Sequence, residues 1–449
     1  MVLGGRAVVS ELRGIAGLAL PIVIGLAAST FHGVVDSIML GPLGAVPLAA
    51  AGLAAAASLI VTSAVWGTLS AVAVRAGQAK WARQNRHICA ILRNGLALGA
   101  GVGVVAALAM ALVWALLPWL GQPPEVIAAT PGYWAFVSLT LVPFSISVVF
   151  RCTFEAVGRP WLGVAFASVS LGAKVPLNLL LIHGPGPLPP LGLMGAGLAT
   201  LLAETLAAAV AWAYWRRARA MRRLRLRRPV LATEVASCAR EGAPLGLLNM
   251  AETGAMAVVT LMIGTFGTAA LAGNQVALSV GGVFYVLPMA FSGAVAVRVA
   301  QEQGAGRPDA MRAVTLAALG LAVGCMAVVG AIMWFGGRTI AAAIVEDPAV
   351  ILAAAAIFAV FAPMQIADAV QSVMLGALRG LSDTAYPATV SMVAYWTLGL
   401  PLGWVIAHHL GQGAPGVWMG YFVALIGSAL LLSLRFAGRT GLRGAAPAV

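Results

Sequence analysis

The chain has 449 residues, of which 61% are hydrophobic and 9% are charged, and its formal net charge is +13. Soluble domains carry about 25% charged residues, so this composition excludes most soluble enzymes and predicts an integral membrane protein. The basic residues gather at the ends of apolar segments, which indicates cytoplasmic loops near anionic lipid rather than a nucleic-acid site.

Twelve apolar stretches are separated by Gly, Pro and charged residues, and a transmembrane helix needs about 20 such apolar residues. The first stretch is too long for the apolar core of a cleaved signal peptide, so we interpret it as a retained span. The predicted spans are 15–40, 44–74, 88–119, 127–156, 163–183, 193–215, 241–265, 268–297, 310–335, 348–377, 385–408 and 415–436.

Arginine and lysine are unevenly distributed between the segments that join these spans. With a cytoplasmic N-terminus, the predicted external loops hold only Arg338. The positive-inside rule therefore places both termini in the cytoplasm. A basic segment, 216–240, separates the two groups of six spans. We expect it to be a cytoplasmic linker between an N-terminal lobe, 1–215, and a C-terminal lobe, 241–449.

The two groups of spans repeat a sequence pattern. In one ungapped register, Pro21 aligns with Pro244, and the AVAVR segment 71–75 aligns with the AVAVR segment 294–298. Two halves of six spans have the same orientation and are related by a pseudo-two-fold axis along the membrane normal. The sequence therefore predicts an all-α membrane protein of two six-helix bundles, which rock to alternate access to a site near the midplane.

Four carboxylates lie within predicted spans: Asp36, Glu204, Glu252 and Asp368. A charge at the bilayer centre costs about 2.5–3.5 kcal/mol, so each acid must face a polar interior, pair with another group or carry a proton. The repeat aligns Asp36, Glu252 and Asp368 with residues that are not acidic. We therefore expect the two halves to differ in role.

A lysine also lies within a span. Lys174 precedes Asn178 by four residues, which places both on one helix face. Its ammonium could pair with Asp36 or with Glu204, and a pair with Glu204 could serve packing alone. In either case Lys174 would occupy the place of a bound cation, which weakens the case for a sodium site in the N-terminal half.

Other chemistry has little support in the sequence. The four cysteines form no C-x-x-C pair and no Cys/His cluster, so neither a metal site nor a disulfide is predicted. Glycine-rich stretches at 99–103 and 192–197 lack the Lys and the strand of a phosphate-binding loop. With no nucleophile–base arrangement either, an enzyme is not expected.

With these residues in place, the chain resembles the multidrug and toxic-compound extrusion (MATE) transporters, most closely their NorM-like branch, over nearly its whole length. Residues 18–54 resemble the opening of that family, with an early Pro and an Asp before a Gly-bearing turn. Residues 368–384 contain D-A-V-Q, G-A-L-R-G and D-T, and resemble its D-A-x-Q…G-x-x-R-G…D-T pattern. Residues 193–204 resemble the segment that opens its sixth span.

The resemblance implies an antiporter that exports bulky amphipathic, often cationic, compounds in exchange for protons or sodium ions. Asp36 matches the acid of the N-terminal half that binds a proton or cation, with Asn178 nearby. Glu252 and Asp368 match the cation-binding acids of the C-terminal half, where sodium could bind, and Tyr285 matches the aromatic residue of that site. A structural hydrogen-bonded pair is the alternative role of Glu252 and Asp368.

Four further residues are candidates for the substrate cavity: Lys174, Thr200, Glu204 and Gln275. Thr200 matches a polar contact in the N-terminal cavity of the family. Gln275 and its neighbour Asn274 either line the path or form hydrogen bonds between helices.

The expected partners are small amphipathic molecules and the lipid bilayer, without nucleic acid. We expect a monomer in the plasma (bacterial inner) membrane, with no cofactor and H+ or Na+ as the coupling ion. The alternative function is a flippase for a lipid-linked precursor on the related scaffold. Such proteins usually carry extra spans and a cationic cavity, whereas here acids outnumber the single mid-span lysine.

Overall fold

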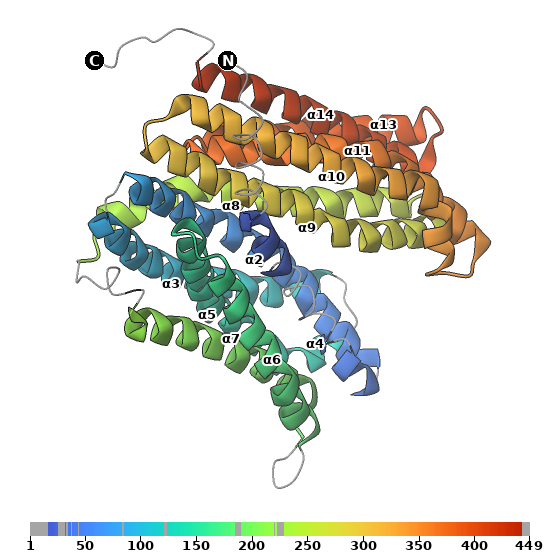
Figure 1. The fold of residues 1–449 in the computed structure, drawn as a ribbon. Helices are drawn as coiled ribbons and strands as arrows, with labels where there is room; N and C mark the ends of the chain where they lie inside the picture. The colour runs from blue at the N-terminus through green and yellow to red at the C-terminus, as the bar shows by residue number, and fades with distance from the viewer. Residues whose placement is uncertain are drawn as a thin grey trace. The chain divides into compact units, whose positions relative to one another are not determined.

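In the computed structural model, every described element is a helix (Figure 1). The structure describes residues 17–25, 32, 35–36, 38–43, 45–82, 85–120, 124–184, 190–219, 221 and 229–441. Lipid offers no partners for backbone N–H and C=O groups, so apolar segments fold as helices, which satisfy these groups internally. Within these residues, eleven helices are long and apolar enough to cross a membrane, in agreement with the expected all-α membrane fold.

The chain divides into two compact units. The first, Pro21–Met250, is organised around α5, which packs on α2, α3 and α7. Its helices are the 3₁₀ turn Gly41–Leu43, α2 (Ala45–Trp81), α3 (Asn85–Leu116), the 3₁₀ turn Leu117–Leu120, α4 (Pro124–Ala129), α5 (Pro131–Ala156), α6 (Trp161–His183), α7 (Gly192–Arg217) and the first part of α8 (Ala232–Gly264).

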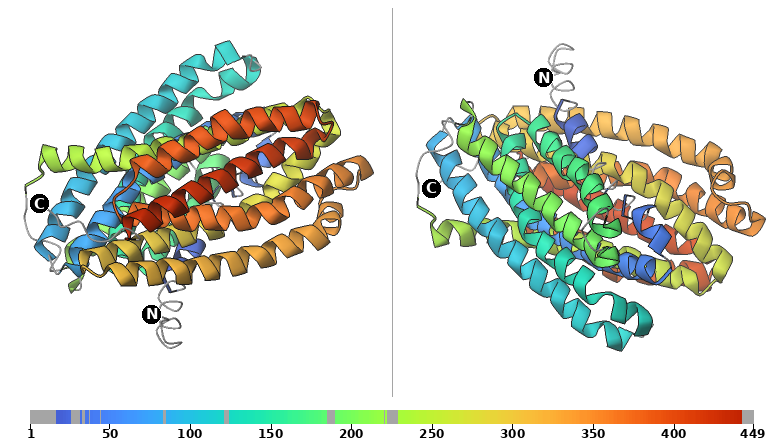
Figure 2. Two further views of the ribbon diagram at one scale, coloured as in Figure 1. Left: turned by 90° about the horizontal axis from the view of Figure 1, so that it is seen from above. Right: turned by 90° about the horizontal axis from the view of Figure 1, so that it is seen from below.

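The second unit contains Ala251–Val449 and is organised around α11, which packs on α9, α10 and α14. Figure 2 shows α10, α11 and α14 side by side. Its helices are the rest of α8, α9 (Thr268–Gly304), α10 (Pro308–Ala342), α11 (Pro348–Gly380), α12 (Ala385–Val393), a π-helical turn (Ala394–Gly399), α13 (Leu400–His408) and α14 (Gly413–Arg439).

Several helices extend beyond the predicted spans. Helix α2 continues past residue 74 through Arg75 to Trp81, and α9 continues past residue 297 through Arg298 to Gly304. A hydropathy scan stops at the first charges, whereas backbone hydrogen bonding continues beyond the apolar stretch. Helix α8 begins at Ala232, inside the 216–240 segment. Parts of the predicted first span and of the arginine-rich segment lie outside the described residues.

Glycine allows α2 and α8 to pack with their backbones in contact inside the first unit. A Cβ on Gly242 would overlap the carbonyl oxygen of Thr68, and a Cβ on Gly246 would overlap the hydroxyl of the same residue. On the α2 side, a Cβ on Gly67 would overlap the carbonyl oxygen of Leu245. Small residues give this close approach in membranes, where association depends on van der Waals packing.

We expect Gly242→Val to lower the thermal stability of the purified protein. Overpacking of a tight contact costs about 1–3 kcal/mol, because side chains and backbone must shift. Gly264→Val is the matched control, since Gly264 lies on the same helix with no other atom within 4 Å of its added Cβ. Equal losses of melting temperature in the two variants would contradict the packing described for α2 and α8.

Candidate functional site

Three helices of the second unit bring Glu252, Tyr285 and Asp368 together. The Tyr285 hydroxyl on α9 donates a hydrogen bond to Glu252 Oε1 on α8, at 3.3 Å. Asp368 on α11 lies within electrostatic range of Glu252, and its Oδ1 accepts a hydrogen bond from Ser372 at 3.4 Å. Both carboxylates are half-buried, so a small ion can reach them.

Among the described residues, no counterion accompanies this acid pair. Within the part of the chain that the structure describes, neither Glu252 nor Asp368 forms an ion pair with a Lys or Arg. Two carboxylates that share a poorly solvated site repel one another, so their simultaneous ionisation is unfavourable without a bound cation. The arrangement therefore suits the binding of a proton or of a hard cation, which prefers oxygen ligands.

The described residues around the pair do not form a larger metal centre. Among the described residues, no group of three or more His, Cys, Asp or Glu side chains converges as a metal site would require. The ligands on offer at Glu252, Tyr285 and Asp368 are two carboxylates and a phenol oxygen. This donor set fits sodium or a proton better than a transition metal, which favours nitrogen and sulfur.

A buried polar network lies behind the acid pair. One turn after Asp368, Gln371 Nε2 donates to Ser428 Oγ at 3.2 Å and to the hydroxyl of Tyr395. The ring of Tyr395, in the π-helical turn, stacks on Tyr421 of α14 with centroids 4.9 Å apart. This network fixes the α11 face that carries Asp368, and π-helical turns are frequent at functional sites. The Gln of the D-A-V-Q motif was the only sequence signal for it.

The two amides on α9 have different surroundings. Asn274 is fully buried, where its Oδ1 accepts from Trp418 Nε1 at 2.9 Å and its Nδ2 donates to Thr260 Oγ1 at 3.4 Å. Gln275 is exposed. Of the two roles left open by the sequence, hydrogen bonding between helices therefore applies to Asn274.

In the first unit, three buried polar side chains lie along one face of α6. Ser170, Lys174 and Asn178 follow one another at intervals of four residues. Lys174 Nζ lies 2.7 Å from Asp36 Oδ2, and Asn178 Nδ2 donates to Asp36 Oδ1 at 3.2 Å. Glu204 on α7 instead accepts a hydrogen bond from Ser170 Oγ at 2.6 Å. Of the two partners open to Lys174, the structure shows Asp36.

The remaining candidates for the substrate cavity are dispersed. The hydroxyl of Thr200 donates to the carbonyl of Ala196 in its own helix, at 3.0 Å. Glu204, one turn further along α7, is half-buried and lies within electrostatic range of Lys174. Gln275 belongs to the second unit, whereas the other three candidates belong to the first.

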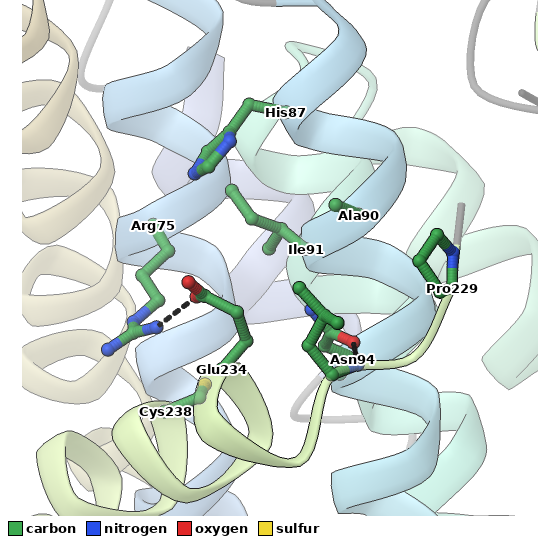
Figure 3. Close-up of a pocket in the computed structure, with 10 residues that line it drawn as sticks. Arg75, His87, Ala90, Ile91, Asn94, Pro229, Glu234 and Cys238 are labelled. Carbon is green, nitrogen blue, oxygen red and sulfur yellow. Dashed lines mark hydrogen bonds and ion pairs between the residues drawn. The ribbon is translucent and has the colours of Figure 1, made fainter.

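A separate cluster joins α2 to the beginning of α8. Arg75 Nε lies 2.7 Å from Glu241 Oε2. Arg75 also pairs with Glu234 at 3.6 Å, as Figure 3 shows. A cavity of about 280 Å³ lies beside these groups and is lined by His87 and Cys238, among others (Figure 3). None of the predicted site residues lines it, so we assign it no part in transport.

Comparison with known proteins supplies the family. A family model described as MatE matches residues 21–180 and 244–405, which together contain all the predicted site residues except Thr200 and Glu204. The chain belongs to the MatE family. MATE proteins are membrane transporters, so the chain is a transporter and an integral membrane protein, and the resemblance seen in its sequence motifs is confirmed.

Curated relatives agree over almost the full length. The chain is 35% identical over 444 residues to the "Probable multidrug resistance protein NorM" of Deinococcus radiodurans, with 96% of each chain covered. It is 32% identical over 441 residues to the "Multidrug resistance protein NorM" of Burkholderia vietnamiensis, with 96% of this chain and 95% of the relative covered.

Solved structures share the fold at lower identity. The Vibrio cholerae MATE transporter VcmN, in its bent form, has a TM-score of 0.87 at 19% identity, with 97% of this chain and 98% of that chain covered. A eukaryotic MATE transporter has a TM-score of 0.86 at 21% identity, with 96% and 98% covered. The all-α membrane fold expected from the sequence is confirmed.

Proposed function

We propose that this MatE transporter is a secondary antiporter, which exports bulky amphipathic, often cationic, compounds in exchange for protons or sodium ions. The names of its relatives, multidrug resistance proteins, support the direction and the breadth of export. The observation that carries the proposal is the half-buried acid pair, Glu252 and Asp368, which has no resident counterion in the described residues.

Coupling requires that the driving ion and the exported compound bind competitively or favour different conformations. A ligand shifts a conformational equilibrium only by its difference in affinity for the two states. An unpaired carboxylate pair meets this requirement, because an added proton or sodium ion changes the net charge of the site. The ion then weakens the binding of a cationic compound nearby and promotes its release.

Each residue of the site has a distinct part in this mechanism. Asp368 and Glu252 hold the proton or sodium ion, and the Tyr285 hydroxyl orients Glu252 through its hydrogen bond. Gln371 and Tyr395 hold the backbone and side chains around Asp368 in place. In the first unit, the charge of Asp36 is compensated by Lys174, so we assign the dominant coupling role to the second unit.

The test is efflux of a fluorescent organic cation from vesicles that contain the purified protein, with the proton and sodium gradients collapsed separately. An antiporter loses efflux when its driving gradient is collapsed. The ion whose gradient is needed for efflux is the coupling ion. Efflux that persists without either gradient would contradict antiport. Gradient-independent movement of a lipid-linked compound, without export of the cation, would favour the flippase.

Tyr285→Phe is expected to weaken coupling without abolishing it. The substitution removes one hydrogen bond to a charged group, worth about 1.5–3 kcal/mol, and leaves both carboxylates in place. Initial rates of gradient-driven efflux should therefore fall, but by less than after loss of Asp368. Tyr386→Phe is the control, because the Tyr386 ring packs on Arg435 and Phe keeps that contact. Equal rates for Tyr285→Phe and the wild type would exclude the orienting role.

A further inference from the structure

We propose that Lys174 is a built-in cation that fills the ion position at Asp36, so that the first unit takes up no sodium ion. This inference concerns a different site from the acid pair of the second unit. The consequence for transport rests on the proposed function. The ion occupancy itself does not, because it is tested by a binding measurement.

The surroundings of the Lys174 ammonium resemble those of a bound cation. Its Nζ lies 2.7 Å from Asp36 Oδ2 and 3.3 Å from the carbonyl oxygen of His32. The side chain of Lys174 is 2% exposed and that of Asp36 is 17% exposed. A carboxylate and a backbone carbonyl are oxygen ligands of the kind that a hard cation selects. Here the ammonium of Lys174, with three N–H donors, occupies the position that such a cation would take.

A further oxygen belongs to Asn178, the amide that contacts Asp36. Asn178 is fully buried and its Nδ2 donates to Asp36 Oδ1, but among the described residues its own Oδ1 has no hydrogen-bond partner. Buried polar atoms are usually satisfied, so an unused amide oxygen beside a carboxylate marks a place where a ligand could bind. With Asp36 and the His32 carbonyl, it forms an oxygen set that becomes available to a cation only when the ammonium is absent.

Electrostatics excludes a second cation while Lys174 is present. The ammonium compensates Asp36, and an added sodium ion would lie against a like charge in a poorly solvated site. Among the described residues, the other titratable groups near the pair are the imidazole of His32, Tyr133 on α5 and Glu204 on α7. Glu204 is hydrogen-bonded to Ser170. In the part of the chain that the structure describes, the acid pair of the second unit has no such lysine, so on this proposal the two halves differ in ion binding.

The experiment measures binding of radiolabelled sodium to the purified full-length protein in detergent. The starting variant is Glu252→Gln/Asp368→Asn, which removes the acids of the second unit and so isolates the first. We expect no saturable sodium binding to this variant. Adding Lys174→Met, which keeps the side-chain volume but removes the charge, should produce one saturable site. Adding Asp36→Asn as well should abolish that site, and Lys174→Arg should not produce it.

Two results would overturn the proposal. One is sodium binding to the starting variant that disappears with Asp36→Asn while Lys174 is intact. The other is no gain of binding in a Lys174→Met variant that remains monodisperse and thermally folded. If Lys174→Met does not fold, the starting variant is compared with and without Asp36→Asn. The proposal requires that neither of them binds sodium, so sodium binding that depends on Asp36 would still contradict it. Transport is not the readout, so failure here is distinguishable from failure of the antiport proposal.

Discussion

Asp368→Asn is expected to reduce gradient-driven efflux by about 5–150-fold. This is the change in affinity that typical coupling free energies between two ligands produce. The substitution keeps the size of the side chain and its hydrogen bond to Ser372, but it removes one of the two charges that we propose hold the driving ion. Glu252 remains, without a second carboxylate to share the cation. The measurement is the initial rate of efflux of a fluorescent cation from vesicles, at a fixed ion gradient.

The control for this prediction is Asp309→Asn, which makes the same chemical change at an exposed position in the first turn of α10. Its efflux should match the wild type. Glu252→Gln should reduce efflux in the same direction as Asp368→Asn, because the two acids act on one ion. Unchanged efflux after Asp368→Asn, in a variant that reaches normal levels in the membrane, would remove Asp368 from the coupling role.

Separation of Asp36 from Lys174 is expected to cost more stability than removal of both. Asp36→Asn leaves a buried ammonium without its counterion, and removal of one partner of a buried pair costs about 3–5 kcal/mol. Lys174→Met leaves the carboxylate unpaired and should cost a similar amount. The double variant Asp36→Asn/Lys174→Met leaves no buried charge at the site, so it should recover most of the lost melting temperature.

The double-mutant cycle is measured as thermal unfolding of the purified protein in detergent. A pair with a second counterion provides the comparison, since Asp383 contacts both Arg439 at 3.0 Å and Arg435 at 2.9 Å. Arg439→Gln should have little effect, because Arg439 is about half exposed and Asp383 keeps Arg435 as its partner. Additive losses in the Asp36/Lys174 cycle would show that the two groups do not depend on one another, contrary to the 2.7 Å contact.

The sequence predicted much of the fold because the physics of the bilayer is simple. Long apolar stretches must fold as helices, and the described helices overlap the predicted spans from 44–74 onwards. Helix ends were less predictable, because hydropathy reports the solvent around a segment rather than its backbone hydrogen bonds. The continuation of α2 to Trp81 is an example, since the predicted span ended before Arg75.

The sequence indicated the candidate site residues but not how they pair. Asp36, Glu252 and Asp368 were evident as charges in apolar segments, and the spacing of Lys174 and Asn178 placed them on one face. The sequence left Lys174 between Asp36 and Glu204, because the choice depends on how α6 packs against other helices. The hydrogen bond from Ser170 to Glu204 and the stacking of Tyr395 on Tyr421 join residues far apart in the chain, and no local pattern specifies them.

The most direct test of the central claim is equilibrium binding of a fluorescent organic cation to the purified protein, with proton and sodium concentrations varied separately. The account predicts that one of these ions weakens binding of the organic cation in the wild type, and that the organic cation weakens binding of the ion by the same factor. In Glu252→Gln/Asp368→Asn this competition should disappear. Competition of undiminished strength in that double variant would contradict the assignment of coupling to the acid pair.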